Sequence, residues 1–170
     1  MKIEKLFSEE EIDKKVEELA NTLYKKYGNE KVVFACILKG AVFFTCDFLK
    51  KYKGNAVLEF LRTSSYDGEN STGKVELILP ISKENIENNN VVIIEDIVDT
   101  GRTLEFLKNY ITKMNPRSLE VCVLLNKPSR RVVEFEPDYC GFEIDNLFVV
   151  GYGLDYDQKY RNLPYIGILK

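Results

Sequence analysis

The chain has 170 residues and a formal net charge of −3, with 45% hydrophobic and 30% charged residues. That length and composition fit one globular domain spanning residues 1–170. The negative net charge argues against a nucleic-acid partner. The sequence contains no run of about 18 apolar residues, the length that a membrane-spanning helix needs. The absence of histidine excludes Ser-His-Asp catalysis and histidine metal centres, so acid–base work falls to Asp, Glu, Lys or Tyr.

The first residues are expected to lead directly into a helix. Ser8 followed by Glu11 three residues later has the pattern of a capping box. Apolar residues then recur at helical spacing from Ile12 to Tyr27, and Gly28 can end the helix.

A buried strand over Val32–Leu38 is the next predicted element, and Lys39-Gly40 ends it. By itself, this turn is weak evidence for a phosphate-binding loop, because glycine occurs routinely in tight turns. The pattern then predicts a helix over 41–52 and a strand over 56–62.

Residues from about 63 to 75 are polar and rich in Gly, Ser and Asn, which predicts a long mobile loop. Its second half, from Gly68 to Val75, nearly matches a phosphate-binding P-loop. Val75 stands where that motif needs a hydroxyl for magnesium, and it opens a predicted strand over 75–81 rather than a helix. We therefore expect a lid, with Ser65 and Tyr66 as its contacts.

The segment from Val91 to Leu104 is the most informative in the chain. An apolar strand over 91–94 is expected to end in two acids, Glu95 and Asp96, before a Gly-containing turn into a helix. Carboxylates accept hydrogen bonds from vicinal hydroxyls, and a helix start offers N–H groups to a phosphate. This combination indicates a site for a ribose that carries a 5′-phosphate.

The C-terminal third has three more predicted strands. A helix ends near Pro116, and a strand over 119–125 precedes Lys127. Further strands are expected over 147–151 and 165–169. Strands that alternate with helices predict an α/β fold with a mainly parallel sheet, whose ligands gather at the carboxyl ends of the strands.

The four cysteines are widely spaced among apolar residues: Cys36, Cys46, Cys122 and Cys140. Buried free thiols in a reducing cytoplasm are therefore expected, rather than disulfides or a metal site.

With these segments in view, the chain resembles the hypoxanthine-guanine phosphoribosyltransferases from about Leu6 to Leu169. The most specific marker is the 92–103 stretch, which is similar to the family's phosphoribosyl-pyrophosphate signature. Supporting segments are Leu38-Lys39-Gly40, Ser64-Ser65-Tyr66, Ser71-Thr72-Gly73, Lys127-Pro128, and 148–156 with Arg161.

The resemblance implies a phosphoribosyltransferase-type fold with a small hood from the C-terminal segment. It also implies a purine-salvage transferase that moves ribose 5-phosphate from phosphoribosyl pyrophosphate to hypoxanthine or guanine, giving IMP or GMP. Mg²⁺ is the implied cofactor, and a cytoplasmic homodimer or homotetramer is the implied assembly. A non-proline cis peptide between Leu38 and Lys39 is expected as well.

The resemblance also assigns site residues. Glu95 and Asp96 would hold the ribose hydroxyls, and Asp99 would take or hold the purine proton. The 5′-phosphate would lie in the loop Asp99, Thr100, Gly101, Arg102 and Thr103, where Arg102 has no role by itself. Pyrophosphate would contact Lys39, Gly40 and Arg161, and the purine would contact Lys127, Phe148, Val149 and Asp155. The metal ligands would be Glu95, Asp96 and Asp155.

Two other functions fit parts of this pattern. One is a phosphoribosyltransferase for adenine, xanthine or a pyrimidine, and the residues that discriminate it are Lys127, Phe148 and Asp155. The other is a regulator that binds phosphoribosyl pyrophosphate as a signal, which the intact pyrophosphate loop argues against. Asn126, which stands where many bacterial members have Asp, leaves the preference among 6-oxopurines open.

Overall fold

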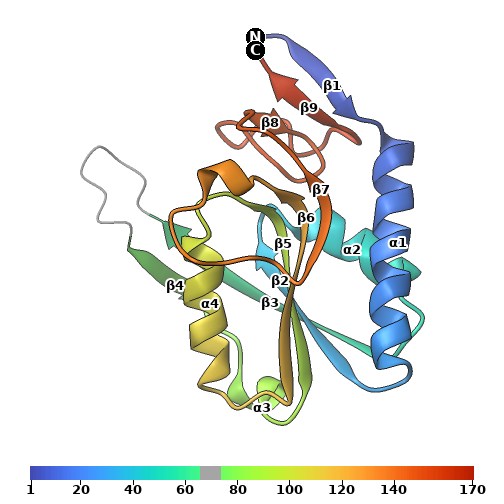
Figure 1. Ribbon diagram of the computed structural model, residues 1–170, viewed down its shortest axis with the longest axis vertical. Coiled ribbons are helices and arrows are strands. Elements are labelled where there is room, and N and C mark those ends of the chain that lie inside the picture. Colours follow the sequence, from blue (N-terminus) through green and yellow to red (C-terminus); the bar gives the residue numbers. More distant parts are fainter. Residues whose placement is uncertain (66–73) are drawn as a thin grey trace.

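A six-stranded sheet forms the body of the molecule, and a smaller three-stranded sheet lies above it (Figure 1). The computed structural model describes residues 1–65 and 74–170. The strands are β1 (Ile3–Phe7), β2 (Val32–Leu38), β3 (Ala56–Ser65), β4 (Val75–Leu79), β5 (Asn90–Val98), β6 (Ser118–Asn126), β7 (Tyr139–Glu143), β8 (Val149–Val150) and β9 (Ile166–Leu169). The helices are α1 (Glu9–Tyr27), α2 (Val42–Lys51), α3 (Lys83–Ile86), α4 (Arg102–Thr112) and the 3₁₀ turn η1 (Pro128–Arg130).

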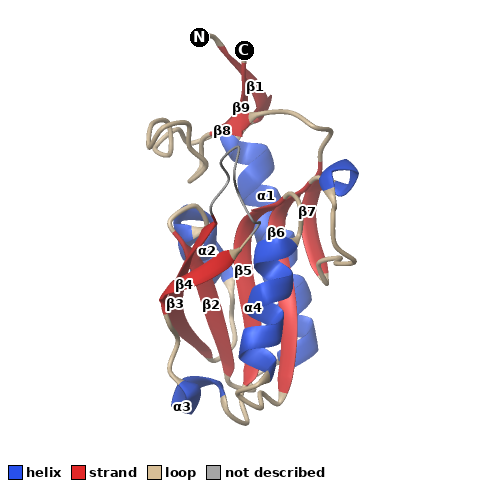
Figure 2. Cartoon of the chain, turned by 90° about the vertical axis from the view of Figure 1, so that its left-hand side faces the viewer, coloured by secondary structure: helices blue, strands red, loops and turns tan. Residues whose placement is uncertain are grey.

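The large sheet has the order β4-β3-β2-β5-β6-β7, and only the β3–β4 pair is antiparallel. Helices α1 and α2 cover one face and α4 the other (Figures 1 and 2). Strand β2 is apolar throughout because both of its faces are covered. The expected α/β fold with a mainly parallel sheet is confirmed.

Helix α1 shows how local sequence fixes one of these layers. Ser8 accepts a hydrogen bond from the Glu11 N–H, and the Glu11 carboxylate accepts one from the Ser8 N–H, so the expected capping box is present. One face of the helix is buried, from Ile12 to Tyr27, and Gly28 ends it at a φ of 56°. A core cluster joins this face to Phe34 of β2 and Phe48 of α2.

The small sheet, which we call the hood, corrects two expectations. Its order is β1-β9-β8, so the N-terminal residues form a strand rather than leading directly into a helix. The hood is therefore built from both ends of the chain and not from the C-terminal segment alone. Figure 1 shows the two termini side by side at its top.

The ends of two strands near the site also differ from the sequence expectation. Strand β5 continues through the acids to Val98, because Glu95 and Ile97 keep pairing with β6. Strand β3 runs to Ser65, which shortens the expected 63–75 loop; residues 66–73, with Tyr66, lie outside the described residues.

Cys36 and Cys122 are buried as expected, but Cys46 is exposed on α2; all four thiols are free.

Within the described ranges, no helix is long and apolar enough to cross a membrane.

Candidate active site

The carboxyl ends of β2, β5 and β6 meet at one edge of the sheet, below the hood (Figure 2). Parallel pairing places Lys39-Gly40, Asp99 and Lys127 at that edge because each directly follows one of these strands. Ligands of open α/β sheets bind at this edge. The expected convergence of the strand-end motifs is therefore present.

A cavity of about 170 Å³ lies at the end of β5. Its lining is almost entirely one continuous stretch, Glu95, Ile97–Leu104, with Val75 from β4. Gly101 has a φ of 87°, and α4 begins at the next residue. The left-handed glycine turns the chain into the helix, so the first N–H groups of α4 border the cavity and suit an anion.

The two acids of β5 are packed in different directions. Glu95 is buried and lines the cavity, whereas a side chain at Gly40 would overlap the Asp96 carboxylate. Burial raises the pKa of Glu95 well above its usual range, and the neighbouring Asp96 charge adds to this. Burial also raises the pKa of Asp96. Hydrogen bonds with the Glu95 side chain and from the Ile97 N–H, together with the charge of Arg161, lower that pKa in part. Buried carboxylates of this kind need a hydroxyl donor or a cation.

Asp99 is held by two arginines that the sequence reasoning did not single out. Arg130 Nε donates to Asp99 Oδ1 at 3.0 Å, and Arg131 Nη1 donates to the Asp99 carbonyl at 2.6 Å. Arg131 also donates to the Asn126 side chain and to the Phe135 carbonyl. The adjacent Arg130-Arg131 pair soon after Lys127 is the sequence signal that could have revealed them.

Lys127 is buried although it carries an ammonium group. Burial lowers its pKa, the Asp99 charge raises it, and the Arg130 charge lowers it further. A buried lysine at a strand end is a strong donor for an acceptor group on a ligand.

The segment after β8 in the hood brings Asp155 and Arg161 to the same edge of the sheet. A side chain at Gly153 would overlap the Gly40 carbonyl, so the turn after β8 lies directly against the loop after β2. Arg161 donates to the Gly153 carbonyl at 2.7 Å and pairs with Asp155 at 3.1 Å. The Leu38–Lys39 peptide is cis, as the resemblance implied. Lys39, Gly40, Asp155 and Arg161 are therefore brought together.

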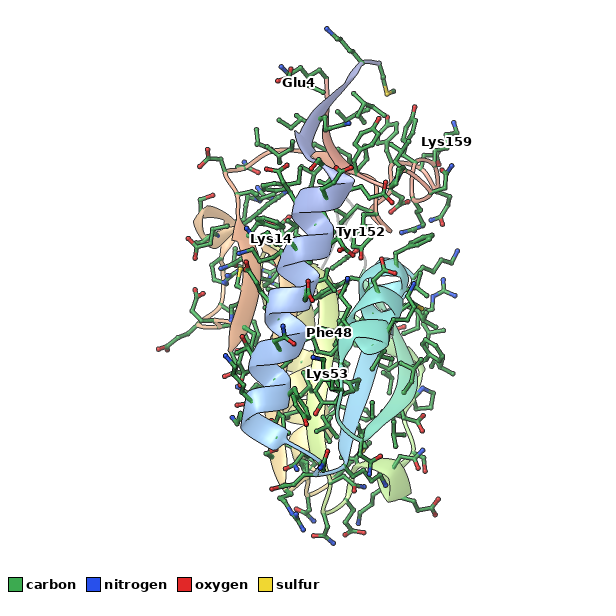
Figure 3. All side chains as sticks on the ribbon, turned by 90° about the vertical axis from the view of Figure 1, so that its right-hand side faces the viewer. Glu4, Lys14, Phe48, Lys53, Tyr152 and Lys159 are labelled. Atoms are coloured by element: carbon green, nitrogen blue, oxygen red, sulfur yellow. The ribbon has the colours of Figure 1, made fainter. Side chains whose placement is uncertain are left out.

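The remaining hood residues differ in exposure. Val149 is buried in β8, whereas Phe148 is half exposed and meets Tyr156 edge to face. Tyr152 is buried and donates to Asp47 of α2 at 2.7 Å; Figure 3 shows it between the hood and the helices. Tyr152 lies within the 148–156 segment, but no role was assigned to it from the sequence.

Magnesium prefers the oxygen ligands that Glu95, Asp96 and Asp155 offer. Among residues 1–65 and 74–170, however, no group of three acids could hold a metal by itself. The donor set fits an ion that also takes oxygens from a phosphorylated substrate, as Mg²⁺ usually does.

Residues 2–157 match the family model described as the phosphoribosyl transferase domain. A hypoxanthine-guanine phosphoribosyltransferase of Streptococcus thermophilus is 43% identical over 166 residues, covering 97% of this chain and 92% of the relative. A hypoxanthine phosphoribosyltransferase of Buchnera aphidicola is 43% identical, covering 97% and 94%. A hypoxanthine-guanine phosphoribosyltransferase from Bacillus anthracis, whose crystal structure holds HEPES in the active site, has a TM-score of 0.94 at 40% identity, covering 99% of this chain and 100% of that chain.

Proposed function

The chain belongs to the phosphoribosyltransferase family, and on that premise we propose that it salvages purines by transferring ribose 5-phosphate from phosphoribosyl pyrophosphate to hypoxanthine or guanine. The products would be IMP or GMP and pyrophosphate. We take residues 1–170 as one domain of this type.

The cavity at the end of β5 is the observation that carries this proposal. A phosphate fits N–H groups at a helix start, and buried carboxylates beside it suit vicinal hydroxyls. Accordingly, Asp99–Thr103 would hold the 5′-phosphate, and Glu95 and Asp96 the ribose hydroxyls.

The purine would lie between β6 and the hood. Lys127 would donate to its 6-oxo group, Phe148 would stack on the ring, and the Val149 carbonyl would face its 2-position. A 6-amino group would meet the Lys127 donor with a donor of its own, which disfavours adenine. Asp99 would take or hold the proton that the purine loses, since the chain has no histidine.

The leaving pyrophosphate would contact Lys39, Gly40 and Arg161. The positive charges of Lys39 and Arg161 would stabilise the negative charge that develops as the bond to the sugar breaks. A bound Mg²⁺ would add further charge stabilisation, with Asp155 beside it. Ser65 and Tyr66 would belong to a lid that keeps water from the activated sugar.

The exposed apolar side chains of the β3–β4 edge support an assembled enzyme. Leu58, Phe60, Ile78 and Leu79 are each at least 36% exposed. Leu58 and Phe60, two residues apart in β3, lie on the same face of the sheet, and apolar side chains exposed together suit a protein contact such as that of a homodimer or homotetramer. Free thiols are consistent with a cytoplasmic location.

The direct test mixes the protein with phosphoribosyl pyrophosphate, Mg²⁺ and each base in turn, with chromatography of the nucleotide formed. Formation of IMP or GMP, with little AMP, is expected. A preference for adenine, or no nucleotide from any 6-oxopurine, would overturn the assignment. The Asp99→Ala variant is the control for background transfer.

A further inference from the structure

We infer that Gln158 is a positioning residue of the pyrophosphate site, because its neutral amide oxygen joins Lys39 to Arg161 and can yield both cations to a pyrophosphate. The inference rests on the proposed function. It adds a role for a residue outside every motif named above.

The amide oxygen of Gln158 is shared by the two cations. Lys39 Nζ and Arg161 Nη2 each donate to Gln158 Oε1 at 3.2 Å. A carbonyl oxygen has two lone pairs, so one oxygen can accept both bonds. One acceptor therefore fixes two positive groups that come from opposite sides of the site, the loop after β2 and the hood.

A tight turn presents the Gln158 side chain. Tyr156 and Lys159 exchange backbone hydrogen bonds at 3.1 and 3.0 Å, and the two residues between them, Asp157 and Gln158, have φ of 52° and 63°. Both values suit the two-residue hairpin turns that need positive φ. Glutamine is not among the residues enriched at positive φ, which makes its presence there informative. The Gln158 N–H also donates to Asp155 Oδ2 at 2.8 Å, so the turn is tied to the site.

The charges in this cluster do not balance. Arg161 is paired with Asp155, whereas Lys39 forms no ion pair within residues 1–65 and 74–170 and donates to the Gln158 amide oxygen instead. Lys39, Arg161, Asp155 and the neutral amide of Gln158 together carry a net charge of +1, which the Asp96 carboxyl group near Arg161 offsets only in part because burial raises its pKa. Phosphate oxygens can replace the amide oxygen and also supply the missing negative charge.

The neutrality of residue 158 is therefore the feature that matters. A glutamate there would have the same shape but would form two ion pairs, and pyrophosphate would have to break both. Exposed ion pairs are weak, and two of them correspond to roughly a twofold to thirtyfold change in a dissociation constant.

The experiment measures binding of pyrophosphate with Mg²⁺ by calorimetry to the wild type, Gln158→Glu and Gln158→Met. We expect the Kd of Gln158→Glu to rise roughly twofold to thirtyfold. Gln158→Met, which has the same length without an acceptor, should bind as tightly as wild type or more tightly. An unchanged Kd in Gln158→Glu would overturn the inference. So would a loss in Gln158→Met as large as in Gln158→Glu, since it would mean that the amide donates to the ligand.

Two controls separate this inference from its premise. Wild-type protein that forms no nucleotide would refute the proposed function, whereas active wild type with unresponsive variants would refute only the role of Gln158. Thermal melting checks folding. If either substitution unfolds the chain, Gln158→Gly, which suits the positive φ, should reproduce the result expected for Gln158→Met.

Discussion

The phosphate cavity and the hood reach the same edge of the sheet by different means. The cavity is formed almost entirely by Glu95 and residues 97–104, which belong to one strand end, loop and helix start. The hood is held by pairings between distant segments, β1 with β9 and β9 with β8, and by the contact of Gly153 with Gly40. A short motif can therefore specify the first region, whereas the second depends on the whole tertiary structure.

The largest expected effect is in the cavity itself. Replacing Asp99 by Ala should lower turnover about a hundredfold to ten-thousandfold, because the purine would lose its proton acceptor. Steady-state kinetics with hypoxanthine measure this, and Asp99→Asn, which keeps the shape, should lose as much. Wild-type turnover in either variant would remove Asp99 from proton transfer.

Gly40, which contacts both Asp96 of β5 and Gly153 of the hood, tests the loop that lies between the two regions. A methyl group there would overlap the Asp96 carboxylate, which must then move. A misplacement of about 1 Å in a site can cost about a hundredfold in rate, so Gly40→Ala should lose about that much activity. Its melting temperature should stay close to wild type, since only an acidic side-chain end is displaced. Full activity would show that the position of Asp96 is not critical.

A substitution of Lys127 tests the proposed binding site for the purine. Lys127→Ala should weaken 6-oxopurine binding about tenfold to a hundredfold, the range for a hydrogen bond from a charged donor, with phosphoribosyl pyrophosphate affinity nearly intact. Separate KM values for the two substrates distinguish the outcomes. Equal loss for both substrates would contradict the assignment.

The same lysine predicts a pH dependence. Burial lowers its pKa from the ordinary lysine value of 10.5, and only the protonated form can donate to the base. The affinity for the base should therefore be complete at a pH below the lowered pKa of Lys127. It should be lost as the pH rises through that pKa, at a lower pH than for an exposed lysine. A KM for the base that stays flat until the pH passes 10.5 would contradict this.

The smallest expected effect concerns the attachment of the hood. Tyr152→Phe removes the hydrogen bond to Asp47 and should cost about 1–2 kcal/mol of unfolding free energy, with a modest rise in KM for both substrates. Tyr139→Phe is the matched control, because its hydroxyl bonds Glu120 at 3.0 Å in another region. The control should lose stability without a change in KM. Identical kinetics in the two variants would show that the Tyr152 bond does not position the site.

The difference between the regions also explains what could be predicted from the sequence. The α/β fold, the capping box of α1 and the segment after β5 follow from local patterns, and all are present. The pairing of β1 with β9 was missed because the five residues of β1 and the helix cap that follows them have the local pattern of a helix start. Arg131 and Gln158 were missed because their roles come from contacts with Asp99 and Lys39, more than 25 residues away in the chain.

The central claim is that the loop after β5 holds the phosphorylated sugar while Lys127 and the hood hold the purine. A crystal structure with bound IMP tests it most directly. The account predicts the 5′-phosphate among Asp99–Thr103, the ribose beside Glu95 and Asp96, and the 6-oxo group at Lys127. A nucleotide bound with its phosphate away from that loop would contradict the account.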